Sequence, residues 1–282
     1  LLKTFLFGFV TWSERRVSIM SDSKKGQKVY IIRHGDRMDR GIDKESEEWQ
    51  KLNPTNEDTP ISYIGRKQAE DTGEFLMKEV DPSNAILISS PWLRCMQTSR
   101  PFAVLSKIPE FLDPAFGEGA EFCTHASPDH SIKSDFKGLV DKSYKPLLDG
   151  KAPKTDMTNV AEALIKRFGY KSGRSIIIFS HADPCIYLAA ALTGKKSIEM
   201  NVASPTAMWT LEQPAEGKPY NVVRNGRIDH LSIYGQTKPW HHDHDMVKKW
   251  RALGWPPPGP KAEGGNALAE FLETYHSLFT SN

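Results

Sequence analysis

Short apolar segments alternate with amphipathic segments along most of the chain. Runs of β-branched and other apolar residues are typical of buried strands, and they occur at residues 28–32, 85–88, 109–112 and 175–179. Segments with apolar residues at helical spacing lie between them, at residues 62–80, 91–107, 159–168 and 183–192. Ser62 suits the position before a helix, Pro91 a helix start and Gly169 a helix end. The pattern predicts strands and helices that follow each other in turn.

This alternation predicts an α/β fold whose mostly parallel sheet is flanked by helices on both faces. Residues 207–211 and 220–224 are expected to form two closing strands. We expect one domain over residues 28–282, with an irregular insertion at about 114–155 that is rich in Gly, Pro, Asp, Ser and Lys. Long irregular segments of this kind are often functional lids. A C-terminal extension at about 226–282 is expected to end in a helix at residues 267–279.

The first residues of the chain do not fit the alternating pattern. We interpret residues 1–27 as an N-terminal extension that is disordered or upstream sequence, with Met20 as the native start. Residues 1–12 are apolar, but about 20 such residues are needed to span a bilayer. They also lack the basic residues that precede the apolar run of a signal peptide. A weak membrane anchor or a truncated signal is the alternative interpretation of this stretch.

Charge and cysteine content narrow the class of protein further. The 37 basic and 35 acidic residues give a net charge of +2, so nothing in the overall charge favours nucleic-acid binding. A locally basic pocket for an anionic substrate remains compatible with this balance. Cys95, Cys123 and Cys185 are few, odd in number and far apart, which is not a disulfide framework. We expect a cytoplasmic protein that binds neither nucleic acid nor membrane, and that forms a homodimer.

Reactive residues follow three of the predicted strands, at the point where each strand ends. The three segments are Arg33-His34-Gly35-Asp36-Arg37, Ser89-Ser90-Pro91-Trp92-Leu93-Arg94 and Ser180-His181-Ala182-Asp183. In open α/β sheets, ligands bind beyond the carboxyl ends of the strands. We therefore expect two histidines and three arginines to meet at one edge of the sheet.

A pocket of this composition suits a phosphoryl group. Arginine forks match phosphate oxygens, often through two hydrogen bonds each. Gly35 allows a close approach to the backbone, and the helix expected to begin near Pro91 directs free N–H groups to the same edge. A neutral imidazole in such a pocket can attack phosphorus as a nucleophile. Each motif alone is weak evidence, and the combination carries the prediction.

Four motifs together resemble the histidine phosphatase superfamily, also called phosphoglycerate-mutase-like. They are Arg33-His34-Gly35, Ser62-Tyr63-Ile64-Gly65-Arg66-Lys67-Gln68-Ala69, Ser89-Ser90-Pro91-Trp92-Leu93-Arg94-Cys95-Met96-Gln97-Thr98 and Ser180-His181. The resemblance spans roughly residues 28–212 and thins out over 115–155 and after about 225. It implies a single phosphoglycerate-mutase-like domain and phosphoryl-transfer chemistry.

The first motif is closer to one subgroup of this superfamily. Arg33-His34-Gly35-Asp36-Arg37-Met38-Asp39 resembles the Arg-His-Gly-Glu-Arg-x-Asp variant of the TULA/Sts-type and ecdysteroid-phosphate phosphatases. Asp36 departs from the subgroup but keeps its charge. The mutases of the superfamily carry Arg-His-Gly-Glu-Ser-x-x-Asn instead. The resemblance therefore favours a phosphatase acting on phosphomonoesters, with phosphotyrosine or aryl phosphates among its substrates.

The resemblance also assigns roles. His34 is the nucleophile that becomes phosphohistidine, and no cofactor is required. The phosphate is held by Arg33, Arg37, Arg94, His181 and Ala182. Asp113-Pro114-Ala115-Phe116-Gly117-Glu118 resembles the subgroup's Glu-Pro-Gly-x-Phe-Glu, which gives Glu118 the role of general acid. Glu121 and Asp113 are the alternatives for that role.

Several alternatives remain open. The residues from His241 to Asp245 could bind zinc, although we interpret them as a solvated loop and expect no metal in the mechanism. Trp49 could stack on an aromatic leaving group or simply pack on the surface. The expected partner is a phosphorylated small molecule or a phosphoprotein. A catalytically weak phospho-ligand-binding protein, a mutase and a sugar-bisphosphatase are the competing functions.

Overall fold

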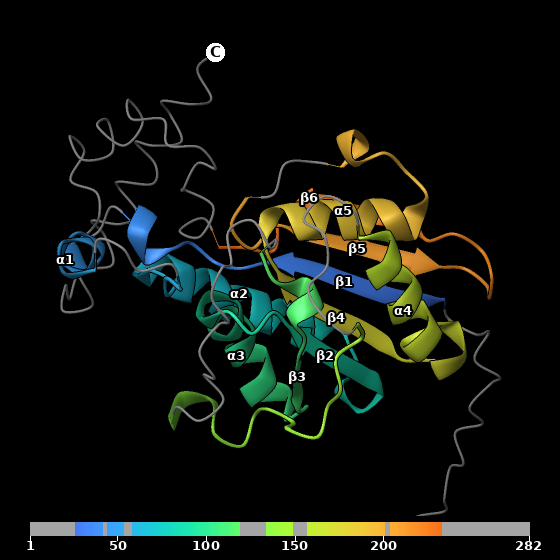
Figure 1. The fold of residues 1–282 in the computed structure, drawn as a ribbon, viewed down its shortest axis with the longest axis horizontal. Coiled ribbons are helices and arrows are strands. Elements are labelled where there is room, and N and C mark those ends of the chain that lie inside the picture. Colours follow the sequence, from blue (N-terminus) through green and yellow to red (C-terminus); the bar gives the residue numbers. More distant parts are fainter. Residues whose placement is uncertain are drawn as a thin grey trace, which may run out of the picture.

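A computed structural model describes residues 26–41, 44–53, 58–118, 134–148, 157–200 and 204–232. These residues form one six-stranded sheet in the order β3-β2-β4-β1-β5-β6, with helices on both faces (Figure 1). The predicted α/β class is therefore confirmed.

Four of the strands are parallel and follow the apolar runs of the sequence. They are β1 (Gln27–Arg33), β2 (Ala85–Ser89), β3 (Glu110–Leu112) and β4 (Ser175–Ser180). β4 lies between β1 and β2, where Ile31 pairs with Ile178 and Ile88 pairs with Ile178 from the other side. Because both faces of these central strands are covered, their residues are buried without alternation.

The sheet closes with two antiparallel strands, as the sequence predicts. β5 (Met208–Gln213) pairs with β1, and β6 (Asn221–Arg227) pairs with β5. β6 is only partly buried along its length. Since β1, β2 and β4, which carry the reactive segments, are parallel to one another, their carboxyl ends still meet at one edge.

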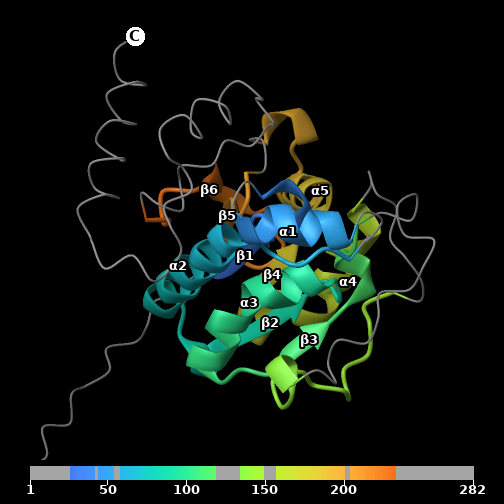
Figure 2. The same cartoon turned by 90° about the vertical axis from the view of Figure 1, so that its left-hand side faces the viewer.

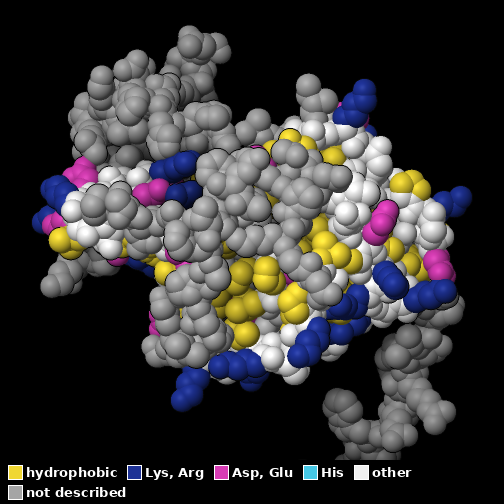
Figure 3. Space-filling view, in the orientation of Figure 1, with side chains coloured by type: hydrophobic (Ala, Val, Ile, Leu, Met, Phe, Trp, Pro, Cys, Tyr) yellow, Lys and Arg dark blue, Asp and Glu magenta, His cyan; other side chains and the backbone are white. Residues whose placement is uncertain are grey.

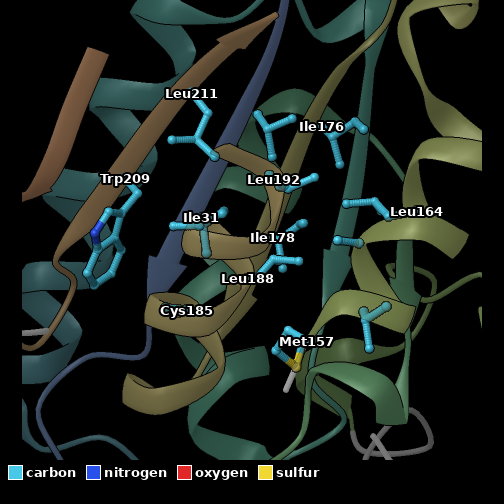
Figure 4. Close-up of a cluster of buried hydrophobic side chains, with 14 of the residues drawn as sticks. Ile31, Met157, Leu164, Ile176, Ile178, Cys185, Leu188, Leu192, Trp209 and Leu211 are labelled. Atoms are coloured by element: carbon cyan, nitrogen blue, oxygen red, sulfur yellow. The ribbon is translucent and has the colours of Figure 1, made fainter. Parts of the chain in front are cut away.

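Two pairs of helices cover the two faces of the sheet. α2 (Tyr63–Glu79) and α3 (Leu93–Ser106) pack on one face, where Leu76 and Phe102 contact apolar residues of the strands. α4 (Thr158–Phe168) and α5 (Ala182–Thr193) cover the other face. Figure 4 shows Leu164, Leu188 and Leu192 of these helices packed against Ile31, Ile176 and Ile178 of the sheet. Burial of such side chains is worth about 1.5–3 kcal/mol each and fixes the layers.

The structure adds elements that the sequence pattern does not predict. α1 (Lys44–Leu52) lies between the first strand and α2. Its sequence is mostly polar, and Ser46 is its buried residue, so it lacks the apolar stripe that identifies a helix. Six short 3₁₀ turns complete the described elements: η1 (Met38–Arg40), η2 (Pro82–Asn84), η3 (Pro114–Phe116), η5 (Ser134–Phe136), η6 (Tyr170–Ser172) and η7 (Ser197–Glu199).

Some predictions fall on residues that the structure does not describe. These are the N-terminal extension up to residue 25, much of the insertion, and the extension beyond residue 232 with its expected helix. Among the described helices, none is long and apolar enough to cross a membrane. On the face shown in Figure 3, Lys and Arg side chains lie along the lower edge.

Candidate active site

His34 lies directly after β1, with its backbone held between two neighbouring strands. Its N–H donates to the Ser180 carbonyl at 2.9 Å, and its own carbonyl accepts from the Thr206 N–H at 3.2 Å. The imidazole is buried, with 2% of the residue exposed. Figure 2 looks onto this side of the molecule, toward which β1 points.

The protonation of His34 follows from its neighbours. Its Nδ1 lies 2.7 Å from the Gly35 carbonyl oxygen, which can only accept a hydrogen bond. Nδ1 therefore carries the proton, and Nε2 keeps its lone pair. Burial, followed by the positive charges of Arg33 and Arg94, lowers the pKa of His34 well below its ordinary value. The ring is thus a neutral imidazole with one unprotonated nitrogen.

Two glycines let the loop after β1 contact the start of α2. A Cβ atom on Gly35 would lie 2.8 Å from the Gly65 carbonyl oxygen, and one on Gly65 would lie 2.3 Å from the Asp36 carbonyl oxygen. The Asp36 carboxylate accepts from the Ser62 hydroxyl at 2.6 Å, and Ser62 caps α2 by accepting from the Gly65 N–H. The motif at the start of α2, residues 62–69, therefore packs against the motif that carries His34 and holds it in place.

Arg94 comes from the first turn of α3 and is 1% exposed. Thr98, one turn later, donates to the Arg94 carbonyl at 2.6 Å and accepts from the Gly35 N–H at 2.9 Å. These bonds tie α3 to the loop that carries His34. The guanidinium lies over the Trp92 ring, 4.7 Å from its centroid, and forms an ion pair with Glu118 through Nη2.

His181 precedes α5 and faces His34. The two ring centroids are 5.3 Å apart, in an edge arrangement. Nε2 of His181 lies 3.0 Å from the Ser90 hydroxyl, and Nδ1 lies 3.7 Å from a carboxylate oxygen of Glu118. Burial, then the charges of Arg94, Arg33 and Arg37, lowers the pKa of His181 well below its ordinary value. The charges of all three arginines thus disfavour protonation of this imidazole.

Arg33 and Arg37 differ in how they are held. Arg33 is 6% exposed, and burial together with the charges of Arg40 and Arg37 lowers its pKa to about 9. Nε and Nη2 of Arg37 each donate to a carboxylate oxygen of Asp39, at 2.9 and 2.7 Å. Ala182 is the first residue of α5, directly after His181, and is partly exposed.

The three candidates for general acid have separate environments. Glu118 contacts both Arg94 and His181, and its side chain is 33% exposed. Asp113 is fully buried and accepts from the Ala115 N–H, the Tyr144 hydroxyl and the Leu147 N–H, at 2.7–2.9 Å. It holds the insertion in place, which favours Glu118 over Asp113. Glu121 lies outside the described residues.

The position of Glu118 is fixed from the strand beside it. The Ser180 hydroxyl donates to the Phe116 carbonyl at 2.7 Å. Phe116 is fully buried at the end of η3, two residues before Glu118. This bond joins the segment after β3 to the end of β4, next to His181.

α3 begins at Leu93, close to Pro91 as expected. The expectation of a free N–H is wrong for Leu93, because Asp58 accepts from it at 2.9 Å. Asp58 also lies 4.0 Å from Nη1 of Arg94. Sequence analysis missed Asp58 and Ser90 as members of the site. A carboxylate upstream of α2 gives no signal of its contact with α3, whereas Ser90 lies inside a recognised motif and could have been singled out.

The residues that could bind zinc lie in the C-terminal part of the chain. The stretch from His241 to Asp245 lies outside the described residues. Within the part of the chain that the structure describes, no group of three or more His, Cys, Asp or Glu side chains could hold a metal ion. The described pocket instead contains buried arginines and two neutral imidazoles, which suit an anionic group.

Comparison with known proteins agrees with this picture. The model of the histidine phosphatase superfamily (branch 1) matches residues 29–225. The chain is 31% identical over 97 residues to the transcription factor tau 55 kDa subunit of Saccharomyces cerevisiae, a match that covers 32% of this chain and 20% of that subunit.

A solved structure shows the same fold. The ecdysone phosphate phosphatase from Bombix mori, in complex with tungstate, superimposes with a TM-score of 0.54 at 19% identity, over 80% of this chain and 99% of that one. A mycobacterial glucosyl-3-phosphoglycerate phosphatase gives a TM-score of 0.47 at 19% identity, over 73% of this chain and 100% of that one. The family match covers more than half of the chain, and the resemblance of the four motifs is confirmed: the chain belongs to the histidine phosphatase superfamily.

Proposed function

We propose that the protein is a phosphatase that hydrolyses phosphomonoesters through a phosphohistidine on His34. The observation that carries this proposal is the bond from Nδ1 of His34 to the Gly35 carbonyl, at 2.7 Å. It fixes the tautomer in which Nε2 is unprotonated and therefore nucleophilic. The ring is buried, and the charges of Arg33 and Arg94, which act on it, would hold a dianionic phosphoryl group.

The first chemical step follows from this arrangement. Arg33, Arg37, Arg94 and His181, at the start of α5 with Ala182, bind the nonbridging oxygens and stabilise the charge of a loose, in-line transition state. Nε2 of His34 forms a bond to phosphorus while the bond from phosphorus to the leaving oxygen breaks. Glu118 gives its proton to that oxygen, so that an alcohol or phenol departs.

The second step regenerates the enzyme. Glu118, now a carboxylate, removes a proton from a water molecule, which attacks the phosphohistidine. The bond between Nε2 and phosphorus breaks, and inorganic phosphate is released. Before substrate binds, Glu118 is paired with Arg94. We infer that the phosphoryl group replaces Glu118 as the partner of Arg94, and that Glu118, now beside an anion, takes up a proton from solvent, which it donates in the first step.

A trapping experiment tests the proposal. Brief incubation with a ³²P-labelled phosphomonoester should give a labelled protein whose adduct is stable to alkali, lost in acid and located at His34. The His34→Ala variant should give neither adduct nor turnover. Label on serine or cysteine, or full activity of the variant, would contradict the assignment.

We propose phosphotyrosine and other aryl phosphates as favoured substrates. Arg37 adds a third guanidinium to a clamp around one phosphate, and Asp39 holds it in a fixed orientation. The superfamily's mutases carry a serine at this position, as the resemblance implies. A phenoxide also leaves more easily than an alkoxide and depends less on a well-placed general acid.

A second candidate function is phospho-ligand binding with weak catalysis. It is favoured by the similarity to a transcription factor subunit, whose name describes no enzyme. Turnover of p-nitrophenyl phosphate that is lost in His34→Ala would support the phosphatase. Binding of inorganic phosphate without turnover would support the second candidate instead. Efficient phosphate transfer between positions of phosphoglycerate, or hydrolysis restricted to sugar bisphosphates, would favour a mutase or a sugar-bisphosphatase.

A further inference from the structure

The two ring nitrogens of His181 have different surroundings. Nε2 lies 3.0 Å from the Ser90 hydroxyl and 3.5 Å from the Cys95 sulfur, away from the pocket. Nδ1 is buried and has no hydrogen-bond partner among the described residues. A carboxylate oxygen of Glu118 lies 3.7 Å from Nδ1. The nitrogen that faces the phosphate site is therefore Nδ1.

The available protons can be assigned one by one. The Cys95 thiol donates to the Ser180 carbonyl at 3.5 Å, and a carbonyl oxygen can only accept. The Ser90 oxygen accepts from the Trp92 N–H at 3.4 Å, and both its proton and its second lone pair could meet Nε2 of His181. The Glu118 carboxylate lies 3.7 Å from Nδ1 and favours a proton on that nitrogen, so it is the Ser90 proton that meets Nε2. With Nε2 accepting, the proton of a neutral imidazole must lie on Nδ1.

We propose that Ser90 is a positioning residue that holds His181 in the tautomer with its proton on Nδ1, so that the ring donates a hydrogen bond to a nonbridging phosphoryl oxygen. This inference rests on the proposed phosphatase function for its chemical purpose, but not for its geometry. The opposite tautomer would place the Nδ1 lone pair against an anionic oxygen. Ser90 thus directs the one proton of the neutral ring to Nδ1, toward the phosphate site.

The environment of the ring supports a neutral state. Burial and the three arginines lower the pKa of His181 well below its ordinary value, so protonation of both nitrogens is disfavoured. A neutral ring has two tautomers. Among the described residues, Nε2 contacts the Ser90 hydroxyl and the Cys95 sulfur, and the sulfur is only a weak hydrogen-bonding group. The hydroxyl of Ser90 is therefore the group on which the choice depends.

Ser90→Ala should change the tautomer and the rate together. In protein uniformly labelled with ¹⁵N, long-range ¹H–¹⁵N spectra distinguish protonated from unprotonated ring nitrogens, and His181→Gln assigns the signals. We expect protonated Nδ1 and unprotonated Nε2 in the wild type, and a mixture of tautomers or the reverse one in Ser90→Ala. For p-nitrophenyl phosphate, kcat should fall by about 10- to 1000-fold with a smaller change in KM, as when one donor to a transition-state oxyanion is lost.

Two further variants separate positioning from packing. Ser90→Thr keeps the hydroxyl and should restore the wild-type ring signals and most of kcat. Ser89→Ala is the matched control, because Ser89 is equally buried and its hydroxyl donates to the Ser90 carbonyl at 2.9 Å rather than to His181. It should leave the His181 signals unchanged.

The outcomes distinguish this inference from the proposed function. A proton on Nε2 in the wild type, or unchanged ring signals in Ser90→Ala, would overturn the role of Ser90 whatever the activity. The expected spectra in a protein that turns over no phosphomonoester would support the tautomer and overturn the phosphatase. The spectra are recorded without substrate, so the two results are independent.

Discussion

At the scale of single residues, Arg94 shows how the pocket is held ready for an anion. Its guanidinium is buried and permanently charged, and it is paired with Glu118, with Asp58 4.0 Å from Nη1. Its Nε and Nη1 have no hydrogen-bond partner among the described residues. A buried charge of this kind is costly unless paired. A phosphoryl group that brings two or three oxygens would satisfy these donors.

We predict that Arg94→Ala lowers kcat/KM for p-nitrophenyl phosphate by about 10²–10³-fold, the usual loss for one donor to a developing anion. Arg94→Lys should recover part of this loss, because it keeps the charge but not the planar fork. Steady-state kinetics of both variants provides the measurement. Arg100→Ala is the control, since Arg100 lies on the same helix but is exposed and donates to the Asp135 carbonyl. Near-normal kcat/KM in Arg94→Ala would contradict the converging pocket.

The sequence predicts some of these residues and misses others for a physical reason. His34, Arg94 and His181 follow buried strands, and parallel strands bring their carboxyl ends together. That rule places side chains at an edge but does not say which atom faces which. Asp58 meets α3 through a contact across 35 residues, and the role of Ser90 depends on one hydroxyl proton. Neither follows from spacing along the chain.

At the scale of elements, β3 carries a carboxyl group in the interior. Glu110 is fully buried between β3 and α3, where the Ser99 hydroxyl donates to it. Its backbone also pairs with the chain beyond η5, through bonds with Leu139 and Asp141 at 2.7 and 3.0 Å. Burial raises the pKa of Glu110 to about 7, against the opposing effect of the hydrogen bond from Ser99.

This raised pKa makes stability depend on pH in a defined window. Between pH 4.5 and about 7 the unfolded chain has released the Glu110 proton, whereas the folded protein still holds it. Stability from this group is therefore lost as pH rises through the window. Replacing Glu110 by Gln keeps an acceptor for the Ser99 hydroxyl. Because Gln cannot ionise, the replacement removes this dependence of stability on pH.

We predict that the free energy of unfolding of Glu110→Gln, measured relative to that of the wild type, increases from pH 5 to pH 8 by on the order of 3 kcal/mol. Urea unfolding of both proteins at the two pH values checks this. His34 and His181 are unchanged in the variant, so their own pH dependence cancels in the comparison. Parallel changes in the two proteins would show that Glu110 is not protonated in the fold. Asp135→Asn serves as control, because Asp135 is exposed nearby.

Elements with an apolar pattern are predicted well, and others are not. All six strands lie within two or three residues of their predicted bounds, because each carries an apolar run or closes the sheet beside one. The sequence pattern does not predict α1, because this helix is polar on nearly every side. It is placed by contacts with η1, where the Gln50 amide donates to the Met38 and Gly41 carbonyls at 2.9 and 3.1 Å. Such tertiary contacts leave no periodic signal.

At the scale of the whole molecule, the fold places a helix with three glutamates, two of them ion-paired with Lys44 and Arg66, on the side toward which β1 points. α1 packs on η1, which follows Arg37 directly, and carries Glu45, Glu47 and Glu48. Figure 2 shows α1 across the side of the molecule onto which β1 points. A basic pocket attracts every phosphate ester, whereas negative charge near its opening disfavours ligands that bring additional anionic groups. Specificity therefore depends on elements around the shared site, as expected when one fold serves many substrates.

We predict a higher kcat/KM for phosphotyrosine than for phosphoserine, and the lowest for 3-phosphoglycerate, whose carboxylate adds a negative charge. Changing Glu45, Glu47 and Glu48 together to Gln should raise kcat/KM for 3-phosphoglycerate several-fold and change that for p-nitrophenyl phosphate less. The measurement belongs at low salt, because exposed charges are screened beyond about 10 Å at 0.1 M ionic strength. The control is Glu79→Gln with Glu216→Gln, since these two residues lie by the first residues of β1 and β4, at the opposite end of the strands. A wild-type preference for 3-phosphoglycerate, or equal effects of the two sets of variants, would show that α1 does not select the substrate.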